Sequence, residues 1–205
     1  MQYALVDVVE DEAAIREADE TARKWLADPS RVDPDTAAVM VDLGSRKAGD
    51  DRIDALIGAL KKTTSPQDRQ VALHALAGFN DPTKLEHALD RTLTDDIAQD
   101  EVRSVVGGAM MRRVARPTAW QWLAKHWDEV QKKVPGHLSL PIVNALGFGC
   151  TTREADEIAT FFVPRTTSLP GAERRIAEAA EETNLCVALR RKGATSISNA
   201  LGKKR

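Results

Sequence analysis

Histidines beside acidic residues are the side chains in this sequence that could bring zinc chemistry. A hydrolytic zinc helix needs two histidines four residues apart and a glutamate beside the first, so that both imidazoles face one metal ion. Glu86 directly precedes His87, but no second histidine follows at that spacing. No two of the four histidines are four residues apart: His74, His87, His126 and His137. We therefore expect no metal site and no cofactor within this chain, and we interpret His74 and His87 as packing or surface residues.

Motifs for other catalytic chemistry are also missing from the sequence. There is no G-x-S-x-G turn to present a serine nucleophile and no G-x-x-x-x-G-K loop to hold a phosphate. Carboxylate pairs such as Asp95-Asp96 and Glu181-Glu182 occur often. Exposed helix faces carry many such pairs, and nothing distinguishes one of them as an acid and a base. The sequence therefore predicts no catalytic residue.

The densest small basic cluster contains three arginines, Arg112, Arg113 and Arg116. Two interpretations stay open. Cations at the C-terminus of a helix offset its dipole and satisfy its last carbonyls. Alternatively, guanidinium groups on a concave surface could bind an anion such as a peptide carboxylate. The second interpretation makes these three arginines candidate peptide-binding residues.

The charge balance argues against a nucleic-acid partner. The chain carries 29 basic and 31 acidic residues, which leaves a net charge of -2. Binding to a phosphate backbone depends on a surplus of Lys and Arg, and no such surplus is present. The short basic end, residues 203–205, is interpreted as a solvated tail.

Cellular location is predicted from the N-terminus, the apolar runs and the cysteines. Asp7 and Glu10 interrupt the first ten residues, so no signal peptide is expected, and no apolar run approaches the length of a membrane span. The two cysteines, Cys150 and Cys186, lie among apolar residues. We expect both to be reduced packing residues of a cytoplasmic protein without a membrane partner.

Apolar residues recur at helical spacing along most of the chain. Ile53, Leu56, Ile57 and Leu60 form one amphipathic stripe at i, i+3, i+4 and i+7. Helix starts are marked by a capping residue followed by proline or by a capping box. These starts are Asp33-Pro34, Ser65-Pro66, Asp81-Pro82 and Thr151 to Glu154.

Two longer helices are predicted in the second half of the chain. One runs from about Ile97 to Val114 and contains Gly107-Gly108, which costs about 2 kcal/mol of helix propensity and so indicates close approach of a neighbouring helix. The other begins at Pro170-Gly171 and is expected to end before a final turn around Ile197 and Leu201. Two tryptophans of the helix between them, Trp120 and Trp127, are seven residues apart and predicted to pack in the core.

The fold class that follows is all-α, because no segment reads as a strand. Helices of about 12 to 18 residues with short links are typical of helix hairpins that stack into a superhelix. The repeat length varies, so we expect a degenerate HEAT- or armadillo-like solenoid of antiparallel helix pairs. Residues 1–205 are predicted to form a single helical-repeat domain.

Several segments resemble the helical C-terminal domain of the M1 zinc aminopeptidases, and the likeness is closest to the cytosolic puromycin-sensitive branch. The first two are Gln99–Gly108 and Ala119–Trp127. Gly147-Phe148, Phe161-Phe162 and Pro170–Arg174 then follow in the family's order, and the tail from Arg190 to Leu201 is similar to its closing helix. The chain departs from the family where Asn184 is not followed by a tryptophan and where His126 replaces an asparagine.

The resemblance implies that this chain is the C-terminal fragment of a larger aminopeptidase. In that family a zinc-binding domain releases amino acids from peptide N-termini, and the helical domain covers the active site and restricts or positions peptides. The resemblance therefore implies zinc only in the parent enzyme, with the catalytic domains of the same polypeptide and peptide substrates as partners. The family's H-E-x-x-H helix and G-A-M-E-N loop are absent from this sequence.

Two other hypotheses remain. The chain could be a stand-alone α-solenoid scaffold that binds peptides or proteins on its concave face. An H-E-x-x-H helix encoded upstream of Met1 in the same reading frame would favour the aminopeptidase domain over this scaffold. A helical enzyme with an unrecognised site is the least favoured reading, because it requires a polar cluster that the sequence does not reveal.

Overall fold

The computed structural model describes residues 11–134, 142–169 and 171–202. These residues form α-helices, short 3-10 helices and turns, and none of them lies in a strand. The all-α prediction is thereby confirmed. The chain divides into two compact units, Met1–Val134 and Pro135–Arg205. The single domain over residues 1–205 stays a prediction.

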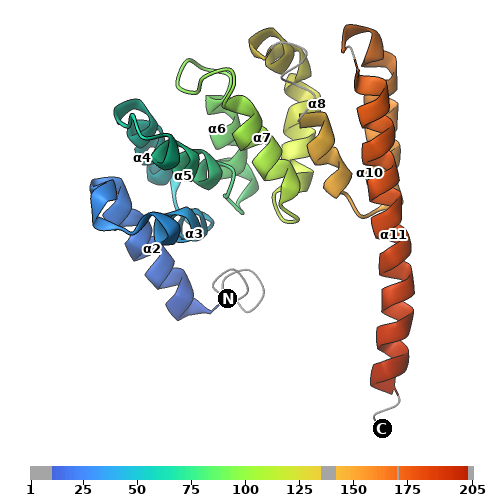
Figure 1. Cartoon of the computed structure of the whole chain (residues 1–205), viewed down its shortest axis with the longest axis horizontal. Coiled ribbons are helices and arrows are strands. Elements are labelled where there is room, and N and C mark those ends of the chain that lie inside the picture. The colour runs from blue at the N-terminus through green and yellow to red at the C-terminus, as the bar shows by residue number, and fades with distance from the viewer. Residues whose placement is uncertain (1–10, 135–141, 170, 203–205) are drawn as a thin grey trace. The chain divides into compact units, whose positions relative to one another are not determined.

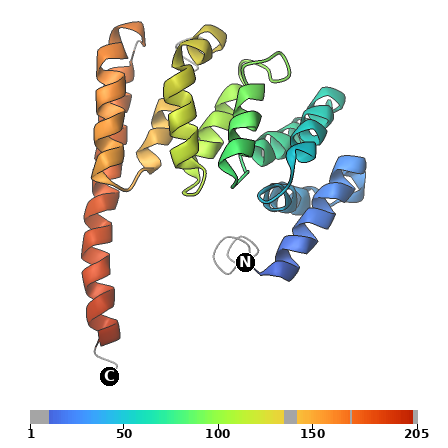
Figure 2. The same ribbon diagram turned by 180° about the vertical axis from the view of Figure 1, so that it is seen from behind.

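The first unit is built from consecutive helices that pack in two rows (Figure 1). The helices are α2 (Glu12–Ala27), α3 (Pro34–Ser45), α4 (Asp50–Lys62), α5 (Pro66–Leu76), α6 (Pro82–Arg91), α7 (Val102–Met111) and α8 (Arg116–Lys133). In one row α3 contacts α5 and α5 contacts α7; in the other α2 contacts α4 and α6 contacts α8. The view from behind shows the same succession from blue α2 to yellow α8 (Figure 2). The HEAT-like superhelix stays a prediction.

Local capping explains where these helices begin. Oδ1 of Asp33 accepts the backbone N–H of Thr36 at 3.0 Å, and proline occupies the first turn of α3. Ser65 at the start of α5 and Asp81 at the start of α6 accept in the same way, from residues three positions on. Each cap satisfies an N–H that the helix itself cannot pair. The helix starts predicted at these three positions are confirmed.

The core of the first unit is formed by the apolar stripes of the helices. The predicted stripe Ile53, Leu56, Ile57 and Leu60 is at most 2% exposed. Close helix contacts depend on two glycines. A Cβ on Gly44 would lie 2.7 Å from the backbone carbon of Ala18 in α2, and one on Gly108 would lie 3.0 Å from Cβ of Ala77. The close approach predicted at Gly107-Gly108 is therefore confirmed.

Helix α7 is shorter than the predicted span from Ile97 to Val114. It begins only at Val102, because the Glu101 carboxylate accepts the backbone N–H of Ala98 and holds residues 98–101 in a turn. It ends at Met111, since Arg112 adopts an extended conformation. Both limits come from side chains that make tertiary contacts, so the helical pattern alone overestimated the length.

The second unit packs short elements against one long helix. It contains the 3-10 helix η3 (Ala145–Phe148), α10 (Thr152–Phe162), the 3-10 helix η4 (Val163–Ser168) and α11 (Ala172–Gly202). η3, α10 and η4 all contact α11. The capping box predicted at Thr151 is confirmed, because Thr151 Oγ1 accepts the N–H of Glu154 and donates to its carboxylate.

Two expectations for this part of the chain are wrong. α11 continues without a break for 31 residues, so no separate final turn forms. Gly193 in its interior costs only about 1 kcal/mol of helix propensity. Cys150 and Cys186 are not reduced, because they form a disulfide with their Cα atoms 5.1 Å apart. The expectation considered each cysteine by its local neighbours, whereas the fold brings together residues 36 positions apart.

Two expectations concern segments that are only partly described. The predicted helix over Tyr3 to Val9 lies outside the described residues, as does His137. In the described part of the chain, no helix is both long and apolar enough to cross a membrane.

Candidate functional site

The three candidate arginines lie at the turn between α7 and α8. Arg112 directly follows the last residue of α7, Arg113 lies within the turn, and Arg116 is the first residue of α8. The turn is short because Arg116 donates its backbone N–H to the carbonyl of Arg112 at 2.8 Å. The three side chains start close together along the chain but differ in what they contact.

Arg112 is committed to a buried carboxylate. Its Nη2 lies 2.5 Å from Oδ1 of Asp42, whose side chain on α3 is only 2% exposed. The other oxygen of Asp42 lies 3.2 Å from Nη2 of Arg46, which is 8% exposed. A Cβ on Gly78 would lie 2.6 Å from Oδ1 of Asp42, so only glycine lets the α5–α6 turn approach this carboxylate. Asp42 therefore ties α3 to the α7–α8 turn through Arg112.

Arg116 caps the end of α7. Its Nε donates to the carbonyl of Met110 at 2.8 Å, and its Nη2 donates to that of Met111 at 3.4 Å. Cations at a helix C-terminus satisfy carbonyls that have no partner within the helix. Arg116 thus matches the first of the two interpretations drawn from the sequence.

Two other arginines of the first unit also donate to a backbone carbonyl near the end of a helix. Arg52 donates to the carbonyl of Gly44 near the end of α3 and pairs with Asp19 at 2.6 Å. Arg69 donates to the carbonyl of Leu60 near the end of α4 and forms two hydrogen bonds with Glu101, at 2.7 and 2.8 Å. These bonds hold the pKa of Glu101 below its usual value. Arginine capping combined with an acidic partner is therefore a structural pattern of this fold.

Arg113 differs from its two neighbours. Its side chain is exposed, and it forms no hydrogen bond or ion pair with the part of the chain that the structure describes. A guanidinium in this state can offer both of its edges to a carboxylate. Among the three candidate residues, only Arg113 has its full hydrogen-bonding capacity available for a ligand.

The structure contains a crevice between α6 and α8 that the sequence did not predict. It has a volume of about 300 Å³ and is lined by Glu86, Asp90, Gln121, Trp122, Lys125 and His126. Trp122 donates its indole N–H to Asp90 at 2.7 Å and stacks on His126 with ring centroids 5.1 Å apart. Trp127 is buried, as predicted. Trp120, which was also predicted to pack in the core, is only half-buried, and Trp122 is buried instead. The i, i+4 spacing of Trp122 and His126 was the only sequence signal for this crevice.

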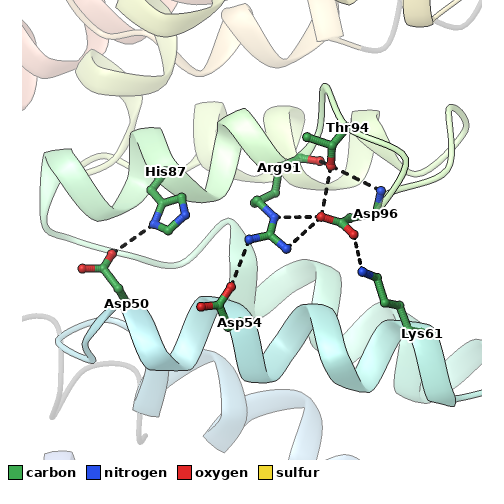
Figure 3. A network of polar contacts seen from close by, with 7 residues as sticks. All are labelled: Asp50, Asp54, Lys61, His87, Arg91, Thr94 and Asp96. Atoms are coloured by element: carbon green, nitrogen blue, oxygen red, sulfur yellow. Dashed lines mark hydrogen bonds and ion pairs between the residues drawn. The ribbon is translucent and has the colours of Figure 1, made fainter.

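Polar and charged side chains also join α4 to α6 (Figure 3). His87 lies 3.1 Å from Asp50, and Arg91 lies 2.9 Å from Asp54. Asp96, which follows α6, forms ion pairs with two cations: Arg91 Nη2 lies 2.8 Å from its Oδ2, and Lys61 Nζ lies 2.5 Å from its Oδ1. Figure 3 shows these pairs as a row between the two helices, with the hydroxyl of Thr94 also directed at Asp96. The row fixes how α4 and α6 lie side by side, and His87 takes part as a surface residue.

Acid is expected to weaken this row at Asp96. The hydrogen bonds from Lys61 and then Arg91 hold the pKa of Asp96 at about 2, below its ordinary 3.8. A carboxyl with a lowered pKa stabilises the fold above its unfolded-state pKa, and this contribution is lost as the pH falls through the folded-state value. Between pH 3.8 and pH 2 we expect a loss of about 1 kcal/mol, since solvent screens part of the interaction.

Urea unfolding of the wild type and of Asp96→Asn, followed by circular dichroism from neutral pH down to pH 2, measures this contribution. The variant should be less stable at neutral pH and should approach the wild type in acid. Asp95→Asn, at the exposed neighbouring position, should keep the wild-type pH dependence. A constant gap between the wild type and Asp96→Asn across the whole range would contradict the assignment.

Metal ligands are not gathered in the described residues. No three side chains of His, Cys, Asp or Glu there are placed so that they could hold one ion. His126 is directed at Glu129 and His87 at Asp50, each in a two-residue contact. Zinc sites in proteins need three or four ligands around one ion. The described residues therefore do not fit a zinc ion.

Known proteins resemble this chain over most of its length. The family model of the ERAP1-like C-terminal domain matches residues 3–185. Aminopeptidase M1-C of Oryza sativa subsp. japonica is 28% identical over 130 residues, covering 62% of this chain and 14% of the rice protein. Alanine/arginine aminopeptidase of Saccharomyces cerevisiae is 26% identical over 145 residues, covering 69% of this chain and 17% of the yeast protein. Aminopeptidase M1 of Arabidopsis thaliana is 24% identical over 151 residues, covering 73% of this chain and 17% of the Arabidopsis protein. The chain thus matches only about a sixth of the length of these relatives.

Proposed function

This chain belongs to the ERAP1-like C-terminal domain family of the M1 aminopeptidases, and from that membership we propose that it is the non-catalytic domain of such an enzyme. In this proposal the parent releases amino acids from peptide N-termini. The present chain covers the active site and restricts or positions the peptides that reach it. Its partners are the catalytic domains of the same polypeptide and the peptide substrates.

The observation that carries the proposal is the match of the family model to residues 3–185. The relatives are named as aminopeptidases, and the chain corresponds to a small part of each. We therefore place the zinc ion and the catalytic residues in parts of the parent outside this chain. The cytosolic branch of the family is also part of the proposal.

The proposed cytoplasmic location meets one opposing observation. Disulfides are uncommon in the reducing cytosol of most cells, and Cys150 and Cys186 are bonded to each other. Fractionation of cells that express the tagged full-length protein decides between the cytoplasm and a more oxidising compartment.

The non-catalytic role is tested on the purified 205-residue chain. We expect no stoichiometric zinc in metal analysis and no hydrolysis of aminoacyl fluorogenic substrates with added zinc. A catalytically competent M1 aminopeptidase assayed in parallel serves as the positive control. Zinc-dependent turnover by the chain alone, above that of a mock purification, would defeat the proposal.

Peptide positioning is tested at Arg113, because Arg112 and Arg116 also hold the fold together. If the Arg113 guanidinium binds the carboxylate of a long peptide, Arg113→Ala in the full-length enzyme should raise KM for long peptides about fivefold, the equivalent of about 1 kcal/mol. KM for dipeptide-sized substrates should not change, since these do not reach the turn. Steady-state kinetics on a series of peptide lengths measures the difference.

Arg103→Ala is the matched control for this variant. Arg103 is also an exposed arginine, near the start of α7, and it forms no ion pair or hydrogen bond within the described residues. Its removal should leave KM unchanged at every peptide length. If Arg113→Ala changes KM equally for short and long substrates, the side chain does not discriminate between peptides by length.

A further inference from the structure

The Cys150–Cys186 disulfide is placed where α11 changes from packed to exposed. The part of α11 before it is packed, and its buried residues are Ala172, Ile176, Ala179 and Thr183. No side chain described beyond Thr183 is buried, and Leu185 and Leu189 are 56% and 69% exposed. In both views the helix continues well past α10 (Figures 1 and 2). The disulfide therefore attaches α11 about one turn after its last buried side chain.

Two glycines let the segment before α10 lie directly on α11. A Cβ on Gly147 would clash with the carboxylate of Glu182 and lie 3.4 Å from Cα of Ala179. A Cβ on Gly149 would lie 3.1 Å from Oγ1 of Thr183. This close contact is made one turn before Cys186 along α11. It places the next residue of the segment, Cys150, opposite Cys186.

A second and independent constraint holds the backbone of Cys150. Its N–H donates to Oε2 of Glu154 at 2.9 Å, and the hydroxyl of Thr151 donates to the same oxygen at 2.7 Å. Thr151 in turn caps α10. Cys150 is thus fixed by α10 on one side and by α11 on the other. Cys150 is therefore held in place by contacts that do not depend on its bond to Cys186.

We propose that Cys150 and Cys186 form a reversible redox site, whose oxidation anchors the exposed half of α11. The oxidant class is a small-molecule disulfide such as glutathione disulfide. One protein thiolate attacks it and releases one glutathione, and the second protein thiolate displaces the other from the mixed disulfide. Two protein thiols and one glutathione disulfide become one protein disulfide and two glutathione thiols. Both cysteines are half-buried, so a small reagent reaches them.

The charge around Cys186 favours such a reagent. No acidic residue occurs between Thr183 and Arg205, whereas Arg190, Arg191 and Lys192 follow Cys186 within two turns. Glutathione carries a net negative charge, and a cationic helix raises its local concentration. Glu154 and Glu182 lie near the loop on the other side, so the attraction comes from the exposed half of α11.

Opening the bond removes the covalent anchor that follows the last buried side chain of this helix. Beyond Thr183 no described side chain is buried, so packing contributes little there, and isolated helices of this length are marginal in water. Fraying therefore proceeds from the exposed end toward Thr183. Arg190, Arg191 and Lys192 lie within the frayed part and are cleavage sites for trypsin.

The experiment uses the full 205-residue chain in buffers of reduced or oxidised glutathione. Thiol titration in denaturant should count two free thiols after reduction and none after oxidation, and mass spectrometry should find the linked peptides. Brief trypsin digestion should cut after residues 190–192 about tenfold faster in the reduced chain, because cleavage follows the open population. Cuts after Arg23 and Lys24, in the first unit, should keep the same rate in both buffers.

The variants Cys150→Ser and Cys186→Ser should be cut rapidly in both buffers. If either fails to fold, the wild-type comparison between the two buffers still tests the proposal. Two free thiols persisting in excess glutathione disulfide would overturn the redox site. An unchanged cleavage rate after residues 190–192, despite a formed bond, would overturn the anchoring role. Neither readout depends on aminopeptidase activity.

Discussion

Gly44→Ala should lower the free energy of unfolding by about 2 kcal/mol, even though alanine is the better helix former. The added methyl group would lie 2.7 Å from the backbone carbon of Ala18 and 3.0 Å from Cβ of Ala22. A helix backbone cannot turn aside as a flexible side chain can, so α2 and α3 must separate. Separation opens the contacts of the cluster formed by Ala14, Ala18, Met40 and Leu43. Urea unfolding followed by circular dichroism measures the loss.

Gly58→Ala is the matched control, because it makes the same change inside another helix. A Cβ on Gly58 in α4 meets no atom within 4 Å. The variant should therefore gain up to about 1 kcal/mol from helix propensity alone. The two substitutions should shift stability in opposite directions. A neutral or stabilising Gly44→Ala would show that α2 and α3 do not approach as closely as described.

Asp42→Ala should cost about 3 kcal/mol, since it removes the carboxylate between two arginines. Arg46 is 8% exposed and Arg112 is 24% exposed, so both cations would lose a short ion pair in a largely dry environment. The α7–α8 turn would also lose its connection to α3. We expect lower stability in urea and faster proteolysis within residues 112–115.

Two variants separate charge from shape at this position. Asp42→Asn keeps the size and one acceptor oxygen but removes the charge, so its loss should be intermediate. Arg16→Ala breaks an exposed pair with Glu12, in which both side chains are more than half exposed, and it should cost less than about 0.5 kcal/mol. If Asp42→Ala costs no more than Arg16→Ala, the buried cluster does not stabilise the fold.

The roles of the three arginines show how far the candidate site could be predicted. The sequence indicated both a capping role and an anion-binding role, and the spacing of Arg112, Arg113 and Arg116 could not choose between them. Arg116 donates to the carbonyl of Met110, six residues earlier in the chain, so its role was close to local. The role of Arg112 depends on Asp42, which is 70 positions away in the chain. Peptide binding at Arg113 stays a prediction.

The helix starts that carry a side-chain cap, and the all-α class, were determined by the sequence alone. A cap such as Ser65 acts on an N–H three residues away, and an apolar stripe such as Ile53 to Leu60 is visible within two turns. Interactions between residues this close in the chain can be predicted from the sequence alone. The same is true of the resemblance to the aminopeptidase domain, which the family match confirmed.

The tertiary structure alone decided the pairing of Cys150 with Cys186, the short span of α7, the burial of Trp122 on Asp90 and the neutralisation of Arg112 by Asp42. Each of these depends on contacts between residues that are far apart in the chain; at the ends of α7 these contacts are Arg69–Glu101 and Arg112–Asp42. Their energies appear only when helix packing removes water and brings the partners within bonding distance. The spacing of residues along the sequence does not reveal the distance between such partners in the folded chain. These long-range contacts could therefore be identified only in the tertiary structure.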